Sequence, residues 1–289
     1  MTLRLDLALR QAVDRLQQST RGDARRDAET LLMDVLRRDR AYLYAHPELE
    51  LSCGEAARYQ ELLERRVRGE PLQYITGRQE FWGIDLLVSR AVLIPRPETE
   101  HAVETALELL RGIESPRVVD VGTGSGCIAL ALASELPQAR IEAVDVSDEA
   151  LDVARQNALQ LGLTHRIAFS RSDLLEKYTS EREAFDMVVS NPPYVGFTEA
   201  NKLQIEVREH EPHCALFGGE QGLDIYRRLI PQAAQVLKRG GWLVIEIGYT
   251  QEQVIGDLLG GWDEVRSVPD LRGIPRVLVA RKRLGLHQQ

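Results

Sequence analysis

The segment Phe185-Asp186-Met187-Val188-Val189-Ser190-Asn191-Pro192-Pro193-Tyr194 contains an apolar run that ends abruptly in two prolines. The run is short, lacks helical spacing and stops at a turn signal, which predicts a buried β-strand over residues 185–189. Proline donates no backbone hydrogen bond and keeps the residue before it extended, so the chain leaves the sheet as a stiff segment. We therefore expect Asn191 at the carboxyl end of a strand, where open α/β sheets bind ligands.

Asn191 and the two prolines carry the groups that would bind an amino group. The Asn191 side chain offers an amide oxygen as acceptor, and the carbonyls of Pro192 and Pro193 are available as further acceptors. Such a corner suits a substrate that presents an –NH2 group. The alternative is a rigid loop in which Asn191 acts only as a cap, and the tetrapeptide alone leaves both open.

From residue 116 onward, short apolar runs alternate with amphipathic helical patterns. This alternation predicts an α/β fold with a mostly parallel sheet and helices on both faces. The expected strands are 118–121, 141–146, 166–169, 185–189, 242–247 and 276–280, and the expected helices are 128–135, 148–161, 223–238 and 251–259.

A glycine-rich turn, Gly122-Thr123-Gly124-Ser125-Gly126, follows the first of these strands. Glycines let the backbone approach a ligand closely, and the N–H groups of such a turn favour an anionic group. In the dinucleotide fingerprint G-x-G-x-x-G the third glycine would stand at Cys127, but here it comes one residue early. The spacing therefore disfavours a nicotinamide dehydrogenase.

Acidic residues follow the second and third strands. Asp145 lies about twenty residues beyond the glycine turn, where an acidic side chain binds the hydroxyls of a ribose. Asp173, followed by Leu174, ends the third strand and is suited to accept a hydrogen bond from an adenine amino group. The three strand ends together predict a nucleoside pocket.

The first part of the chain shows only helical signals. Residues 1–70 predict a small helical domain, with apolar residues at three- and four-residue spacing and a capping box at Ser52 and Glu55. Residues 71–92 alternate aromatics and glycines, which predicts a β-hairpin linker. The α/β domain then covers residues 93–289.

Composition limits the classes of function. The chain of 289 residues has a formal charge of −8 and is 44% hydrophobic, which is typical of a globular protein and disfavours generic nucleic-acid binding. It has no apolar run of membrane-spanning length and no signal peptide pattern, so we expect a cytoplasmic protein. Its three cysteines match no metal or disulfide spacing, and we expect no metal site.

Several sequence blocks resemble a known enzyme family. The G-x-G-x-G turn with acidic residues after two strands resembles the class I S-adenosylmethionine-dependent methyltransferases, and Asn-Pro-Pro-Tyr resembles the subset that methylates planar amino groups. Within that subset the chain is similar to the peptide chain release factor glutamine methyltransferases. The blocks that carry this similarity are 71–77 (PLQYITG), 81–83 (FWG), 93–100 (LIPRPETE), 122–126 (GTGSG), 191–194 (NPPY) and 218–224 (GGEQGLD). Leu174 departs from relatives that place an aromatic residue against the adenine.

The resemblance implies a Rossmann-like class I domain with a seven-stranded sheet, preceded by a helical substrate-recognition domain. The implied cofactor is S-adenosyl-L-methionine, which leaves as S-adenosyl-L-homocysteine. The implied catalytic residues are Asn191, Pro192 and Tyr194, and these residues with Pro193 would bind the substrate amide. The implied cofactor-binding residues are Gly122, Thr123, Gly124, Ser125, Gly126, Asp145, Asp173, Leu174 and Asn191, with Leu93, Ile94, Pro95 and Arg96 along the other side of the pocket.

The implied substrate is the glutamine of the Gly-Gly-Gln motif in class 1 release factors. We expect a monomer that binds neither membranes nor nucleic acids generically. Three alternatives remain: a nucleic-acid adenine or guanine amino methyltransferase, a catalytically idle nucleoside-binding or interaction protein, and, last, a nicotinamide dehydrogenase.

Overall fold

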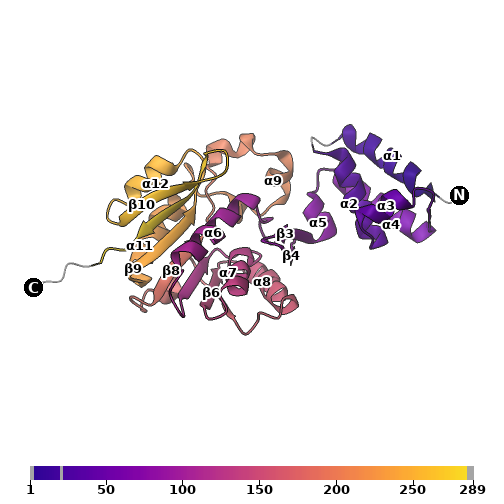
Figure 1. Cartoon of the computed structure of the whole chain (residues 1–289). Coiled ribbons are helices and arrows are strands. Elements are labelled where there is room, and N and C mark those ends of the chain that lie inside the picture. Colours follow the sequence, from indigo (N-terminus) through magenta and orange to yellow (C-terminus); the bar gives the residue numbers. More distant parts are fainter. Residues whose placement is uncertain (1–2, 20–21, 285–289) are drawn as a thin grey trace, which may run out of the picture. The chain divides into compact units, whose positions relative to one another are not determined.

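The computed structural model describes residues 3–19 and 22–284, which form two compact units. Unit 1 contains the residues up to Arg78 together with the later segment Gln204–His210. Unit 2 contains Gln79–Leu203 and the residues from Glu211 onward. Figure 1 shows the elements of both units along the chain.

Unit 1 is mainly helical. Its apolar positions at three- and four-residue spacing form one core, in which Leu16, Leu31 and Leu62 are fully buried. Helix formation here follows from burying these amphipathic faces against one another. The elements are β1 (Leu3–Arg4), α1 (Leu5–Gln17), α2 (Ala24–Leu36), α3 (Arg40–Ala45), β2 (Glu50–Leu51), α4 (Cys53–Val67), α5 (Leu72–Thr76) and α9 (Ile205–His210).

The starts of α2 and α4 are fixed by side-chain caps. Asp23 accepts a hydrogen bond from the Arg26 amide at 3.0 Å. Ser52 accepts from the Glu55 amide while the Glu55 carboxylate accepts from the Ser52 amide, so the predicted capping box is present.

Helix α9 belongs to unit 1 although it lies far along the chain. Arg66, which is 4% exposed, donates to Asp27 at 2.7 Å and lies 2.9 Å from Glu206 of α9. A buried guanidinium needs such partners because an unpaired buried charge is strongly unfavourable. The segment that follows the Asn-Pro-Pro-Tyr corner therefore returns to the helical unit.

The predicted hairpin over residues 71–92 is only partly correct. Residues 72–76 form the one-turn helix α5, because Pro71 precedes it and Gly77, at φ 74°, ends it in the left-handed conformation. The hairpin itself is β3 (Arg78–Phe81) and β4 (Ile84–Leu87). Its two-residue turn, Trp82-Gly83, has positive φ at both positions, as a type I′ turn requires.

Unit 2 is built around a seven-stranded sheet with the strand order β10-β11-β9-β8-β5-β6-β7, which confirms the predicted Rossmann-like fold. Strands β5 to β9 pair in parallel, and β11 is antiparallel to both of its neighbours. The strands are β5 (Arg117–Val121), β6 (Arg140–Asp145), β7 (Ile167–Arg171), β8 (Phe185–Ser190), β9 (Leu237–Glu246), β10 (Asp263–Pro269) and β11 (Pro275–Arg281).

Helices cover both faces of this sheet (Figure 1). Val118 of β5 faces a core that includes α6 and α7, whereas Val119 and Val121 face a core that includes α11 and α12. Burial on both faces explains why the strands are continuous apolar runs. The remaining elements are η1 (Pro97–Thr99), α6 (Glu100–Leu109), α7 (Cys127–Glu135), α8 (Asp148–Gln160), η2 (Glu176–Tyr178), η3 (Phe197–Lys202), α10 (His213–Leu216), α11 (Asp224–Val236) and α12 (Glu252–Leu258).

Among the strands of this sheet, only β10 was not predicted. It pairs only with β11 at the edge of the sheet, and five of its seven residues, 263–266 and 269, are exposed. An edge strand of this kind lacks the apolar run on which the other predictions depend. Within residues 3–19 and 22–284, no helix has the length and apolar character needed to cross a membrane.

Candidate active site

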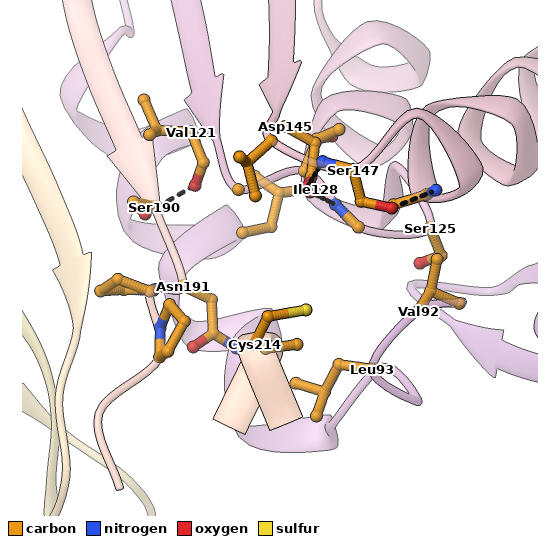
Figure 2. Close-up of a pocket in the computed structure, with 18 of the residues that line it drawn as sticks. Val92, Leu93, Val121, Ser125, Ile128, Asp145, Ser147, Ser190, Asn191 and Cys214 are labelled. Carbon is orange, nitrogen blue, oxygen red and sulfur yellow. Dashed lines mark hydrogen bonds between the residues drawn. The ribbon is translucent and has the colours of Figure 1, made fainter. Parts of the chain in front are cut away.

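A cavity lies at the carboxyl ends of β5, β6, β7 and β8 in unit 2. The sheet order reverses between β5 and β8, because β6 follows β5 on one side and β8 lies on the other. Such a switch point leaves a crevice outside the strand ends. In Figure 2, Asp145 and Ser147 lie along one wall of the cavity, and Asn191, Cys214 and Leu93 lie along the opposite wall.

The glycine turn forms part of the first wall. Gly122, Gly124 and Gly126 all have positive φ, between 55° and 84°, which explains why glycine recurs at every second position. The amides of Gly122 and Thr123 both donate to the Val144 carbonyl, at 2.8 and 3.0 Å. The turn is thereby tied to the end of β6.

Asp120, at the end of β5, stabilises the same turn from inside. One of its oxygens accepts from the Thr123 hydroxyl at 2.6 Å and from the Ala129 amide at 3.2 Å. Burial raises the pKa of this carboxyl to about 7. Gly126 does not line the cavity: a Cβ there would lie 3.2 Å from both Ala154 and Leu130, so this glycine permits close helix packing.

Asp145 lines the cavity, and its carboxylate is already oriented. One oxygen accepts from the Gly124 amide at 2.9 Å and the other from the Ser147 amide at 3.0 Å. Burial raises the pKa of this carboxyl, against the effect of these hydrogen bonds. A carboxylate has about four acceptor positions, so roughly two remain for the hydroxyls of a ribose.

Asp173 and Leu174 also line the cavity, beyond the end of β7. Asp173 accepts from Arg228 at 2.6 Å, and both side chains are 45% exposed. Leu174 has φ 51°, an uncommon conformation for a residue with a side chain. The structure thus places the predicted ribose and adenine residues on neighbouring strand ends.

Asn191, Pro192 and Pro193 leave β8 and form the opposite wall. Just before them, the Ser190 hydroxyl donates to the Val121 carbonyl at 2.6 Å, which joins the ends of β8 and β5 (Figure 2). The Asn191 side-chain amino group donates to the Thr99 hydroxyl at 2.9 Å. Across the described ranges, 3–19 and 22–284, no group donates to Asn191 Oδ1 or to the Pro192 carbonyl, and both acceptors remain available.

Tyr194 does not line the cavity. Its hydroxyl donates to the Glu246 carboxyl at 3.3 Å, and burial raises the pKa of Tyr194 well above its usual value. Glu246 is 2% exposed, and burial raises the pKa of its carboxyl to about 7. Its other carboxyl oxygen accepts from Thr99 at 2.6 Å.

A second segment that contains glycines, residues 218–222, packs against the corner formed by Asn191 to Tyr194. A Cβ at Gly218 would lie 2.3 Å from the Pro193 carbonyl oxygen, and one at Gly222 would lie 2.0 Å from the Tyr194 carbonyl oxygen. The Tyr194 carbonyl also accepts from the Gln251 side chain at 3.0 Å. The GGEQGLD block therefore supports the backbone of the prolines and Tyr194.

Only part of the segment 93–96 lines the cavity. Leu93, Pro95 and Arg96 line the cavity as expected, but Ile94 is buried and lies outside the lining. The Ile94 amide and the Arg96 guanidinium both donate to the buried carboxylate of Glu211, at 3.2 and 2.5 Å.

Several polar residues of the site were not singled out from the sequence. Thr99 and Cys214 line the cavity, and Glu211 anchors the opposite segment. Thr99 lies inside LIPRPETE, one of the blocks that carry the family resemblance, and this was the available signal for it. Glu211 and Cys214 belong to a region without a periodic pattern, so nothing in the sequence marks them.

Comparison with known proteins agrees with both units. The family model described as "PrmC N-terminal domain" matches residues 8–77, and the one described as "Methyltransferase small domain" matches residues 98–208. These two matches fall on the helical region and on the part of the sheet that carries the cavity.

Curated relatives match almost the full chain. The "Release factor glutamine methyltransferase" of Koribacter versatilis is 52% identical over 280 residues, covering 96% of this chain and 99% of the relative. The protein of the same name from Moorella thermoacetica is 43% identical over 286 residues, covering 98% and 99%.

Solved structures show the same fold at low identity. The hMettl16 catalytic domain, in a complex with the MAT2A 3'UTR hairpin 1, has a TM-score of 0.57 at 18% identity and covers 88% of this chain and 90% of that chain. A methyltransferase from Pyrococcus furiosus has a TM-score of 0.51 at 19% identity, covering 70% and 90%. At such identities the likeness concerns the fold alone.

The sheet order, the glycine turn and the acidic strand end define a class I S-adenosylmethionine-dependent methyltransferase. With relatives up to 52% identical over nearly its whole length, the chain belongs to the family of release factor glutamine methyltransferases. This membership disfavours the dehydrogenase and the idle binding protein as alternatives.

Asp145→Ala removes the carboxylate that we expect to bind the ribose hydroxyls and that also holds the Gly124 amide. Hydrogen bonds to a charged group contribute about 1.5–3 kcal/mol, so calorimetry should show S-adenosylmethionine binding weakened by about tenfold or more. Asp152→Ala, which removes an exposed carboxylate from α8, is the matched control. Equal affinity in the wild type and Asp145→Ala would contradict the ribose assignment.

Gly222→Ala places a methyl group 2.0 Å from the Tyr194 carbonyl oxygen at a residue with φ 72°. The neighbouring atom is backbone, so relief requires movement of the corner, and we expect unfolding free energy to fall by about 1–3 kcal/mol together with methyl transfer. Urea denaturation measures the first effect. Gly256→Ala, in α12 with no atom within 4 Å of the added methyl group, should leave both unchanged or raise stability slightly.

Proposed function

We propose that this chain transfers a methyl group from S-adenosylmethionine to the side-chain amide nitrogen of the glutamine in the Gly-Gly-Gln motif of class 1 release factors. The observation that carries the proposal is the pair of available acceptors, Asn191 Oδ1 and the Pro192 carbonyl, at the wall opposite Asp145. The curated relatives named for this activity support the same substrate.

The residues present fit the cofactor. The positive-φ glycine turn leaves backbone groups close to the cavity, since a Cβ at Gly122 or Gly124 would meet no atom within 4 Å. Asp145 keeps acceptor capacity, and Asp173 and Leu174 lie beside it. When bound, S-adenosylmethionine supplies an electrophilic methyl group on a sulfonium.

An amide nitrogen is a poor nucleophile, because its lone pair is delocalised into the carbonyl. The chain must therefore orient the substrate amide and stabilise the charge that develops on nitrogen. We assign this work to Asn191 Oδ1 and the Pro192 carbonyl, each accepting one N–H of the substrate amide. Both hydrogen bonds strengthen as the nitrogen becomes positive, which favours the transition state over the ground state.

Pro192 suits this role because it cannot form a backbone hydrogen bond through its own nitrogen, and its φ is fixed. Pro193 continues the stiff segment, and Gly218 and Gly222 pack closely against the carbonyl oxygens of Pro193 and Tyr194. Tyr194 contributes through the loop, because its hydroxyl is directed to Glu246 and it lies outside the cavity lining.

The helical unit, residues 1–70 in our sequence-based division, is proposed to recognise the protein substrate. Its family match over residues 8–77 supports a role specific to this family. Hydrogen exchange of α1 to α4 with and without release factor tests this, and unchanged exchange would contradict it. We also propose that the chain acts as a monomer in the cytoplasm, which light scattering and cell fractionation test.

The central experiment is mass spectrometry of a class 1 release factor after incubation with the protein and S-adenosylmethionine. A gain of one CH2 unit, about 14 Da, on the glutamine of Gly-Gly-Gln is expected, since the methyl group replaces one hydrogen on nitrogen and that hydrogen leaves as a proton. Parallel incubations of total RNA and DNA with tritiated cofactor test the nucleic-acid alternative. Label in nucleic acid with none in the release factor would overturn the proposal.

Asn191→Ala removes one of the two proposed acceptors. We expect the affinity for S-adenosylmethionine to remain unchanged and kcat to fall by roughly 30-fold to 900-fold. This range corresponds to about 2–4 kcal/mol, by analogy with loss of one preorganised hydrogen bond in an oxyanion hole. Single-turnover transfer to the release factor measures it. Asn201→Ala, an exposed asparagine of η3, is the control, and wild-type turnover by Asn191→Ala would exclude the acceptor role.

A further inference from the structure

We propose that Thr99 and Glu246 are positioning residues that determine which end of the Asn191 side-chain amide faces the cavity. The inference rests on the proposed function of Asn191 as an acceptor for the substrate amide. It assigns to two buried residues a role that they exert through Asn191, although Thr99 also lines the cavity.

The three side chains form one chain of hydrogen bonds. Asn191 Nδ2 donates to Thr99 Oγ1 at 2.9 Å, and Thr99 Oγ1 donates to Glu246 Oε2 at 2.6 Å. Thr99 is 1% exposed and Glu246 is 2% exposed, so water does not compete for these bonds. The links join residues 92 and 147 positions apart in sequence.

The direction of this chain follows from the chemistry of its last member. An ionised carboxylate only accepts hydrogen bonds, and a threonine hydroxyl has a single proton. Thr99 must use that proton toward Glu246, so only its lone pairs remain for Asn191. The Asn191 atom facing Thr99 must then be the amino group, which leaves Oδ1 for the cavity that Asn191 lines.

Without this constraint, either end of the Asn191 amide could face the cavity, because the two ends are nearly equal in shape. A reversed Asn191 would present N–H groups to a substrate amide whose nitrogen also carries only N–H groups. Two donors facing each other would leave both unsatisfied in a partly buried site, which is unfavourable. A fixed polarity therefore removes the unproductive half of the Asn191 orientations.

The same carboxyl also holds the other end of the corner. Glu246 Oε1 accepts from the Tyr194 hydroxyl at 3.3 Å, and the Glu246 backbone carbonyl accepts from the buried Tyr226 hydroxyl at 2.8 Å. Glu246 ends β9, the strand that pairs with β8. The Glu246 carboxyl thus connects Asn191, through Thr99, and Tyr194 to the end of β9.

The test compares Thr99→Val with Thr99→Ser at a pH well above the pKa of Glu246. Valine keeps the shape and removes the hydroxyl, so we expect kcat to fall about tenfold with the cofactor affinity unchanged, the order of effect of one neutral hydrogen bond. Serine keeps the hydroxyl and should restore kcat to near the wild-type value. Thr105→Val, at a buried threonine of α6, is the control and should change neither.

A double-mutant cycle separates positioning from packing. If Thr99 acts through Asn191, Thr99→Val should cause no further loss of kcat in the Asn191→Ala background. An equal loss in both backgrounds, or equal kcat for Thr99→Val and the wild type, would overturn the proposal.

A readout without turnover keeps this inference distinct from the proposed function. The side-chain amide resonances of Asn191, identified by their absence in Asn191→Ala, should shift and exchange faster in Thr99→Val and remain unchanged in Thr99→Ser. If wild-type protein methylates no release factor but shows this pattern, the proposed substrate is wrong and the positioning role stands. If the resonances are the same in Thr99→Val and wild type, the positioning role is wrong.

Discussion

The site depends on the backbone constraint that two consecutive prolines impose at the end of β8. Neither Pro192 nor Pro193 can donate to a neighbouring strand, so the sheet cannot extend beyond Ser190. The Ser190 hydroxyl closes the strand end by donating to Val121 of β5. The chain therefore leaves the sheet at the switch point between β5 and β8, and the Pro192 carbonyl remains available to a ligand.

The two walls of the cavity differ in their backbone: one is rich in glycine and the other is stiffened by proline. Toward the cofactor, the glycine turn supplies backbone that approaches closely, and Asp120 and Asp145 hold that turn through its amides and a hydroxyl. On the side of the substrate, two prolines restrict the backbone, and Gly218 and Gly222 let a second segment pack directly against the carbonyl oxygens of Pro193 and Tyr194. Backbone freedom and backbone stiffness are thus both concentrated around one point of the sheet.

The sequence predicts the regular parts of unit 2 well because burial on both faces gives β5 to β9 and β11 continuous apolar runs. Edge strand β10 and the one-turn helix α5 carry no such pattern, and they were missed or assigned wrongly. The glycine turn, Asp145 and Asn191 can be recognised from the sequence because they lie at the ends of predicted strands. Glu211 is not recognisable in this way, and the partner of Glu246 cannot be predicted either. Their partners, Arg96 and Thr99, lie 115 and 147 residues away, so both pairings depend on the completed fold.

For an acceptor as weak as an amide nitrogen, the chemistry asks for hydrogen-bond acceptors in a fixed direction more than for a strong base. A backbone carbonyl satisfies this without further help, since it can only accept. A side-chain amide does not, since it carries both kinds of group. Asn191 can therefore act beside the Pro192 carbonyl only if another group fixes the orientation of its amide. The buried Glu246 carboxyl does this through the single hydroxyl proton of Thr99.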